Sequence, residues 1–422
     1  MDFTLPEDLR DYLAELDEFI EREIKPLERQ DDNIRFFDHR REDARTDWDR
    51  GGLPSREWET LLGEARTRAD AAGHYRYAFP KEYGGRDGTN LGMAVIREHL
   101  ASQGLGLHCD LQNEHAIVGN NVGLLLMLHY GSPAQQQDWT DDLAAGKRHF
   151  AFGITEPEHG SDATFMETAA TKDGEDWVIT GEKTWNTGIH TASHDLIFAR
   201  TSGTPGSSTG ITGFLVPVGT PGFKVEEYLW TFNMPTDHGR VSLDHVRVPD
   251  SAILGAEGRG LLLVQHFFNE NRIRQAASSL GAAQFCIDRS VEYAKSRKPF
   301  GKPLASNQAI QFPLVELQTQ AEMLRALIHK TAWSMDTYGP LTPVGQGLHV
   351  QLRGQPAVLR RRGPRHAGAR RAGLLAAPAV RAHLPAPPAL PHHRGRRGDP
   401  DAAGGRLPVR LHQARHSQGR HP

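Results

Sequence analysis

The sequence has no run of 18 apolar residues, about the length that a membrane-spanning helix needs, so no such helix is expected. It contains only two cysteines, Cys109 and Cys286, which are too few for a disulfide framework and fit a reducing compartment. The N-terminus lacks the basic and apolar regions of a signal peptide. We therefore expect a cytoplasmic protein without a membrane span.

The sequence also lacks the motifs of two common ligand sites, a Rossmann dinucleotide site and a metal site. No Gly-x-Gly-x-x-Gly follows a predicted strand, which argues against a Rossmann dinucleotide-binding fold. His108, Cys109 and His115 could be considered as metal ligands, as could His190 and His194, but no further ligands follow at metal-site spacing. We expect no metal.

Residues 346–422 lack Phe, Tyr, Trp, Ile, Met, Asn, Lys and Glu altogether. This tail holds 15 of the 49 basic side chains but only two of the 52 acidic ones, Asp399 and Asp401, so the rest of the chain is acidic. Such a composition cannot build an ordinary core and predicts disorder. Most of the missing types have AT-rich codons, which favours GC-rich DNA read in the wrong frame.

A genuine disordered arm and a nucleic-acid-binding tail are the alternatives for this segment. Its arginines could contact phosphates, but it has no lysine and no aromatic side chain for stacking on bases. A folded nucleic-acid reader is therefore not supported, and we expect no nucleic-acid partner.

The residues before the tail change their periodicity twice, which predicts an α+β protein. Residues 1–149 show helical spacing of apolar residues, and residues 150–256 show short β-rich runs without helical spacing. Helical spacing returns in residues 257–345. We expect an N-terminal α-helical domain, a middle antiparallel β-barrel or sandwich, and a C-terminal helical bundle that is incomplete, followed by the tail at 346–422.

The most informative stretch begins at Phe152. The segment Phe152–Asp162 opens with apolar residues and then turns at a proline. This pattern predicts a strand that leads into a loop with exposed backbone N–H groups and the hydroxyls of Thr155 and Ser161.

A second strand-like part follows soon after. It consists of Trp177–Thr180, a predicted turn at Gly181, and Lys183–Gly188. Here Trp185 offers a flat apolar face, and Thr187 offers a short, rigid donor. Together with Thr155 these groups suit a planar heteroaromatic ligand whose edge needs hydrogen bonds. A β-hairpin with a core tryptophan and ordinary turns is the alternative.

Three motifs in this order resemble the acyl-CoA dehydrogenase family. They are Ile154-Thr155-Glu156-Pro157 with Gly160-Ser161-Asp162, then Trp185-Asn186-Thr187, then Arg297-Lys298-Pro299-Phe300-Gly301 with Gln308. The resemblance covers about residues 5–340. It implies an FAD-dependent oxidoreductase of fatty acid metabolism that oxidises the Cα–Cβ bond of an acyl-CoA and passes electrons to an electron-transfer flavoprotein. It also implies a homodimer or homotetramer.

The resemblance further implies roles for residues around the flavin ring of FAD. Backbone groups of Phe152, Ile154 and Thr155, with the Thr155 hydroxyl, would bond the pyrimidine edge. Donors at this edge stabilise the negative charge that develops on reduction. Trp185 would pack against the ring system, and Thr187 would lie near its N5 side.

Other implied roles concern the phosphates and the substrate. Ser161 would contact both the FAD pyrophosphate and the acyl-CoA. Arg297, Phe300 and Gln308 would hold the ADP half of FAD, typically in a neighbouring subunit. Arg297 suits this role because a guanidinium binds pyrophosphate through a planar set of donors. Arg272 would lie by the acyl-CoA; without the resemblance it could equally be part of a solvated helix face.

The catalytic base of the family is not found. The reaction removes a weakly acidic α-proton and needs a carboxylate in a dry site. In most members this carboxylate lies between the last helices, but residues 346–422 have no glutamate. In some members it precedes the arginine matched by Arg272; that position is Asn271 here, and Glu270 is one residue off.

We therefore expect little or no dehydrogenase activity from this polypeptide. A non-catalytic flavin- or CoA-binding remnant and an acyl-CoA oxidase-type relative are the alternative functions.

Overall fold

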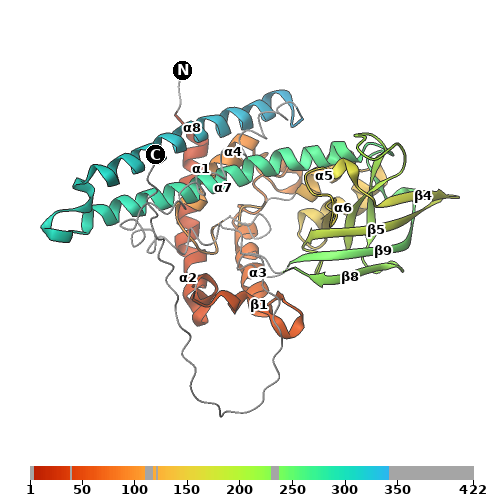
Figure 1. Cartoon of the computed structure of the whole chain (residues 1–422), viewed down its shortest axis with the longest axis horizontal. Coiled ribbons are helices and arrows are strands. Elements are labelled where there is room, and N and C mark those ends of the chain that lie inside the picture. Colours follow the sequence, from red (N-terminus) through yellow and green to blue (C-terminus); the bar gives the residue numbers. More distant parts are fainter. Residues whose placement is uncertain (1–3, 39, 110–116, 120–121, 230–236, 342–422) are drawn as a thin grey trace, which may run out of the picture. The chain divides into compact units, whose positions relative to one another are not determined.

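The computed structural model of the chain describes residues 4–38, 40–109, 117–119, 122–229 and 237–341 (Figure 1). The first part is helical, as predicted. Its α-helices are α1 (Glu7–Phe19), α2 (Lys25–Arg29), α3 (Arg56–Ala71), α4 (Asn90–Ser102), α5 (Val122–Tyr130) and α6 (Pro133–Ala144), with a two-stranded β1 (Thr46–Asp47) and β2 (Leu53–Pro54) between them.

Helix α1 buries Leu9, Tyr12, Leu16 and Phe19, whose spacing of three or four residues places them on one face. A π-helical turn, Ile20–Ile24, leads directly from α1 into α2, where Pro26 occupies the first turn. A proline is tolerated there because that turn needs no N–H donor from it.

The middle of the chain forms an eight-stranded sheet. Its strands are β3 (Phe150–Gly153), β4 (Ala169–Asp173), β5 (Asp176–Thr187), β6 (His194–Arg200), β7 (Ile211–Pro217), β8 (Phe223–Tyr228), β9 (His238–Pro249) and β10 (Ile253–Leu254). The order is β10-β7-β6-β4-β5-β9-β8, with β3 paired to β6. Pairing is mainly antiparallel, as expected, but β3 and one residue of β4 pair with β6 in parallel.

Both faces of the central strand β6 are covered. Leu196 and Phe198 join the apolar cluster that contains α5, α6 and the start of the next helix, whereas Ile197 and Ala199 join the cluster on the other face. Successive side chains of a strand point to opposite faces, so a strand covered on both sides is apolar throughout.

Two features of the sheet were not predicted. Strand β4 has no apolar alternation, because Ala170 is its one buried residue. The turn predicted at Gly181 was wrong, since β5 runs through it as one strand with a register shift. Gly181 has φ +153°, and a Cβ there would come within 2.4 Å of the Thr168 hydroxyl oxygen, so this irregularity requires glycine.

Helices α7 (Gly260–Ser296) and α8 (Gln308–Tyr338) follow and lie side by side (Figure 1). Helix α4 packs against both. The α4–α7 contact is close, because a Cβ at Gly281 would lie 2.1 Å from the Glu98 carbonyl oxygen. The 346–422 tail lies outside the described residues, and the proposed domain boundaries fall near the start of β3 at Phe150 and the start of α7.

Within the described ranges, no helix has both the length and the apolarity that crossing a membrane requires.

Candidate functional site

The end of β3 is joined directly to β5. The Thr184 N–H donates to the Thr155 carbonyl oxygen over 2.9 Å, and the Lys183 ammonium donates to the Ile154 carbonyl oxygen over 3.3 Å. These bonds bring the two predicted ligand-binding segments together. We call the surface formed by Phe152–Thr155 and Trp185–Thr187 the cradle.

A buried ion pair lies beneath the cradle. Lys183 and Glu156 are 0% and 5% exposed, and Lys183 Nζ lies 2.8 Å from Glu156 Oε1. The Glu156 carboxylate also accepts the backbone N–H groups of Glu167 (2.6 Å) and Thr168 (2.9 Å). Burial alone would raise the pKa of Glu156, but the Lys183 charge and these donors hold it below its ordinary value.

This ion pair changes the hydrogen-bonding strength of the cradle. The Ile154 carbonyl that accepts from Lys183 shares its peptide unit with the Thr155 N–H, so the ammonium polarises that N–H and makes it a stronger donor. Among the described residues, neither the N–H nor the hydroxyl of half-buried Thr155 bonds to another protein group. Both are available to a ligand.

Trp185 stands on a bulge in β5. The pairing of β5 with β9 shifts between Lys183 and Asn186, and Trp185 has φ +66°. A non-glycine residue in this region is strained by about 1–3 kcal/mol, and such strain is concentrated at functional sites. The bulge leaves the indole 47% exposed although its neighbours on both sides are buried, so it offers a flat apolar face.

Asn186 links β5 to β6 beneath the cradle. It is fully buried, and its side-chain amide donates to the carboxyl group of Asp195 on β6. Burial raises the pKa of Asp195 to about 7. Gly153 lies over this pair, because a Cβ there would come 2.8 Å from the Asn186 amide nitrogen. No sequence pattern indicated this pair, which joins residues of different strands.

Thr187 completes the cradle on β5. Its hydroxyl oxygen lies 2.8 Å from Nδ1 of His238 on β9. The His238 ring meets Trp185 edge-on, with centroids 6.2 Å apart. Sequence reasoning missed His238, although its strand position opposite Thr187 would have revealed it once the register was known.

The remaining predicted residues near the cradle are placed as follows. Phe152 stacks on Phe267 of α7, with ring centroids 4.2 Å apart, and so ties the cradle to that helix. Ser161 is exposed in the loop after β3. On α7, Arg272 donates to the Asn269 side-chain oxygen over 3.1 Å and lies over the Phe268 ring.

The predicted ADP-binding residues lie at the opposite end of α7. Gly260, at its start, packs against β7, whereas Arg297 follows its end and Gln308 opens α8. The cradle contacts α7 at Phe267, and Arg297 follows 30 residues later, which is about 45 Å along a helix. The two predicted parts of the FAD site therefore lie far apart within one chain. Phe300, in the link between the helices, is fully exposed.

A buried polar cluster lies between α5 and α7. Glu270 accepts from His266 Nε2 (3.2 Å) and from Arg274 (3.3 Å), and the Tyr130 hydroxyl lies 3.2 Å from His266 Nδ1. Burial alone would raise the pKa of Glu270, but His266 and Arg274 hold it below its ordinary value. Its carboxylate is thereby a weaker base, and it is already bonded on both oxygens.

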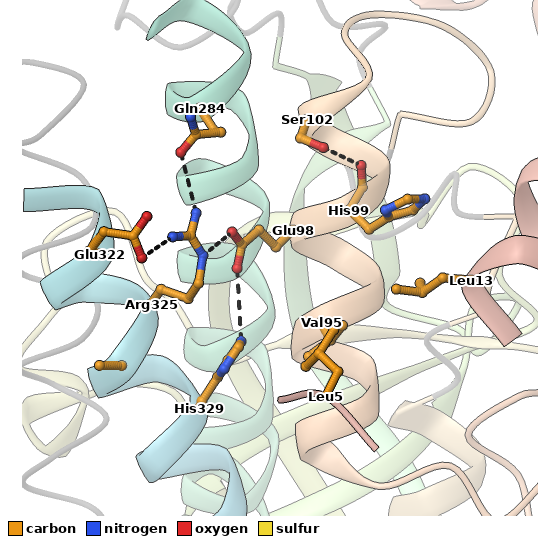
Figure 2. Close-up of a pocket in the computed structure, with 11 residues that line it drawn as sticks. Leu5, Leu13, Val95, Glu98, His99, Ser102, Gln284, Glu322, Arg325 and His329 are labelled. Carbon is orange, nitrogen blue, oxygen red and sulfur yellow. Dashed lines mark hydrogen bonds and ion pairs between the residues drawn. The ribbon is translucent and has the colours of Figure 1, made fainter. Parts of the chain in front are cut away.

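A cavity of about 450 Å³ lies apart from the predicted site residues. Figure 2 shows the side chains that line it. Side chains of α1, α4, α7 and α8 line it. Arg325 points into it but is bonded to Glu98 (2.6 Å), Glu322 (2.5 Å) and Gln284 (3.3 Å). Because the carboxylates of Glu98 and Glu322 offset the Arg325 charge, the described lining of this cavity holds no arginine or lysine left over for a pyrophosphate.

Comparison with known proteins finds three consecutive sequence models of one family. Residues 30–147 match the acyl-CoA dehydrogenase N-terminal domain, residues 151–246 the middle domain and residues 258–351 the C-terminal domain.

Two relatives and one solved structure illustrate the similarity. The chain is 30% identical to glutaryl-CoA dehydrogenase of Desulfococcus multivorans over 341 residues, which cover 80% of each protein. It is 33% identical to the human mitochondrial short-chain specific acyl-CoA dehydrogenase over 264 residues, or 62% of each. A glutaryl-CoA dehydrogenase structure from Mycobacterium smegmatis in complex with FADH2 has 26% identity and a TM-score of 0.67, covering 90% of this chain and 89% of that one.

Proposed function

Because this chain belongs to the acyl-CoA dehydrogenase family, we propose that its cradle binds the flavin ring of FAD and that its reaction is the α,β-oxidation of an acyl-CoA. FAD supplies the acceptor for the hydride that leaves the β-carbon. An electron-transfer flavoprotein is the proposed next electron carrier.

The observation that supports this assignment most is the unpaired donor set of Thr155. Its N–H, strengthened by Lys183, and its hydroxyl fit the acceptor atoms along the pyrimidine edge of a flavin. Trp185 would cover the ring, and Thr187 would donate near N5. The Thr155 carbonyl oxygen and the Thr187 hydroxyl are held by hydrogen bonds without a ligand, which reduces the ordering that binding requires.

We propose that a second copy of the chain completes the FAD site. The length of α7 separates Arg297, Phe300 and Gln308 from the cradle of the same chain, and exposed Phe300 is free to meet another molecule. Sedimentation of the protein with and without FAD tests this step. Dimers or tetramers should form with FAD, and a flavin-loaded monomer would contradict it.

Substrate oxidation by this chain is proposed to be slow or absent. Asn271 occupies the helix position that carries the base in some relatives, and Glu270 is bonded to His266 and Arg274. The second candidate function, a flavin- or CoA-binding protein without turnover, is favoured by these two residues. Anaerobic mixing of the FAD-loaded protein with butyryl-CoA or glutaryl-CoA separates the two functions, because a protein that oxidises the substrate bleaches its flavin and a binding protein without turnover does not.

A further inference from the structure

Thr187 and His238 are direct partners across β5 and β9. The sheet register therefore fixes the 2.8 Å distance between Thr187 Oγ1 and His238 Nδ1. Two further contacts lie beside this pair: the Gly188 N–H donates to the Asp237 carbonyl oxygen over 2.7 Å, and the Trp185 ring meets the His238 ring edge-on.

The direction of this hydrogen bond depends on the histidine tautomer. If Nδ1 carries a proton, it donates to Thr187 Oγ1, and the hydroxyl proton remains for another acceptor. If Nδ1 is bare, the hydroxyl donates to it and presents only lone pairs to a ligand. The tautomer of His238 thus decides whether Thr187 acts as a donor or as an acceptor.

The surroundings favour a proton on Nδ1. The carboxylate of buried Asp237 has an oxygen 3.5 Å from the same nitrogen, and a nearby negative charge stabilises a proton there. Among the described residues, the Thr187 hydroxyl has one other acceptor within reach, the Trp185 carbonyl oxygen at 3.5 Å. That distance is at the limit for a hydrogen bond, so the carbonyl competes weakly for the hydroxyl proton.

We propose that His238 is a positioning residue that fixes Thr187 as a hydrogen-bond donor and thereby makes the cradle select the oxidised form of its flavin. This inference rests on the proposed function. The N5 atom of oxidised FAD is an acceptor, whereas the same atom carries a hydrogen after reduction. A hydroxyl held as a donor bonds to the first form and opposes the second.

The experiment measures the midpoint potential of FAD bound to the full chain, by equilibration with a reference dye. In His238→Leu the Thr187 hydroxyl loses its histidine partner, so it can donate to N5 of oxidised FAD or accept from N5–H of reduced FAD. The ratio of the dissociation constants for oxidised and reduced FAD should then rise up to tenfold, which corresponds to a potential higher by about 30 mV for a two-electron couple. In His238→Asn the side-chain amide can donate from nearly the same place and should restore most of the difference.

His245→Asn is the matched control, since His245 is an exposed histidine of the same strand that pairs with Asp244. Its potential should equal that of the wild type. An unchanged potential in His238→Leu, or a failure of His238→Asn to restore the wild-type value, would overturn the proposal.

Nitrogen NMR of the histidine rings in the ligand-free protein separates this proposal from the proposed function. The His238 signal, identified by its loss in His238→Asn, should show a proton on Nδ1. A proton on Nε2 alone would refute the positioning role even if FAD binds. If the wild type binds no FAD but the Nδ1 proton is present, the proposed function and the flavin selection are both refuted. The proposed hydrogen bond from His238 to Thr187 would still hold.

Discussion

Replacing Lys183 by methionine should destabilise the protein strongly while removing little volume. The ammonium is completely buried and bonds to Glu156 and to the Ile154 carbonyl. Leaving one member of a buried ion pair alone costs about 3–5 kcal/mol. The Glu167 and Thr168 N–H groups would still stabilise the Glu156 carboxylate, so we expect a loss near the lower limit, about 3 kcal/mol.

Equilibrium urea unfolding followed by tryptophan fluorescence measures this loss. The double variant Lys183→Met/Glu156→Gln removes both charges and should recover about 1–2 kcal/mol of it. Lys172→Met is the control, because Lys172 forms an exposed ion pair with Asp250 on the same sheet, and its stability should match the wild type. A Lys183→Met variant as stable as the wild type, or a double variant less stable than the single one, would refute the reasoning.

Three further predictions concern the cradle and the helix packing. Trp185→Gly should raise stability by about 1 kcal/mol in urea unfolding, because glycine tolerates the +66° φ angle, yet it should weaken FAD binding measured by fluorescence titration. Burial raises the pKa of Asp195 above its unfolded value, to about 7, so its contribution to stability is complete below about pH 4 and is lost as the pH rises toward 7. The free energy of unfolding should therefore be lower at pH 8 than at pH 5 in the wild type, and this difference should be smaller in Asp195→Asn. Gly281→Ala should force α4 and α7 apart and cost about 2 kcal/mol or more, whereas Gly63→Ala, with open space around it on α3, should slightly stabilise the protein in the same assay.

The sequence predicted the fold because apolar spacing is a local property. The helical period of α1, α7 and α8 and the short apolar strands are each visible within a few residues. Strand β4 was not predicted because its Ala-Ala-Thr-Lys-Asp sequence has one buried residue, and its position is set by its pairing with β5. The bulge at Trp185 was not predicted because no sequence pattern indicates a positive φ angle at a non-glycine residue.

The candidate site was predictable only where residues lie close together in the chain. The motifs located Thr155, Trp185 and Thr187, and their proposed contacts with FAD remain predictions. His238 lies 51 residues from Thr187 along the chain, and only the pairing of β5 with β9 joins them. Glu156 lies within the first motif and Lys183 lies two residues before the second, but from sequence alone two charged residues are expected to be exposed to solvent, and only the structure shows that they form a buried pair.

Titration of the purified full chain with FAD tests the central claim most directly. The absorbance of bound flavin, measured for the wild type and for Trp185→Gly side by side, should saturate near one FAD per chain in the wild type and require more FAD in the variant. Absence of saturable binding by the wild type, or equal affinity in both proteins, would contradict a flavin site between β3 and β5.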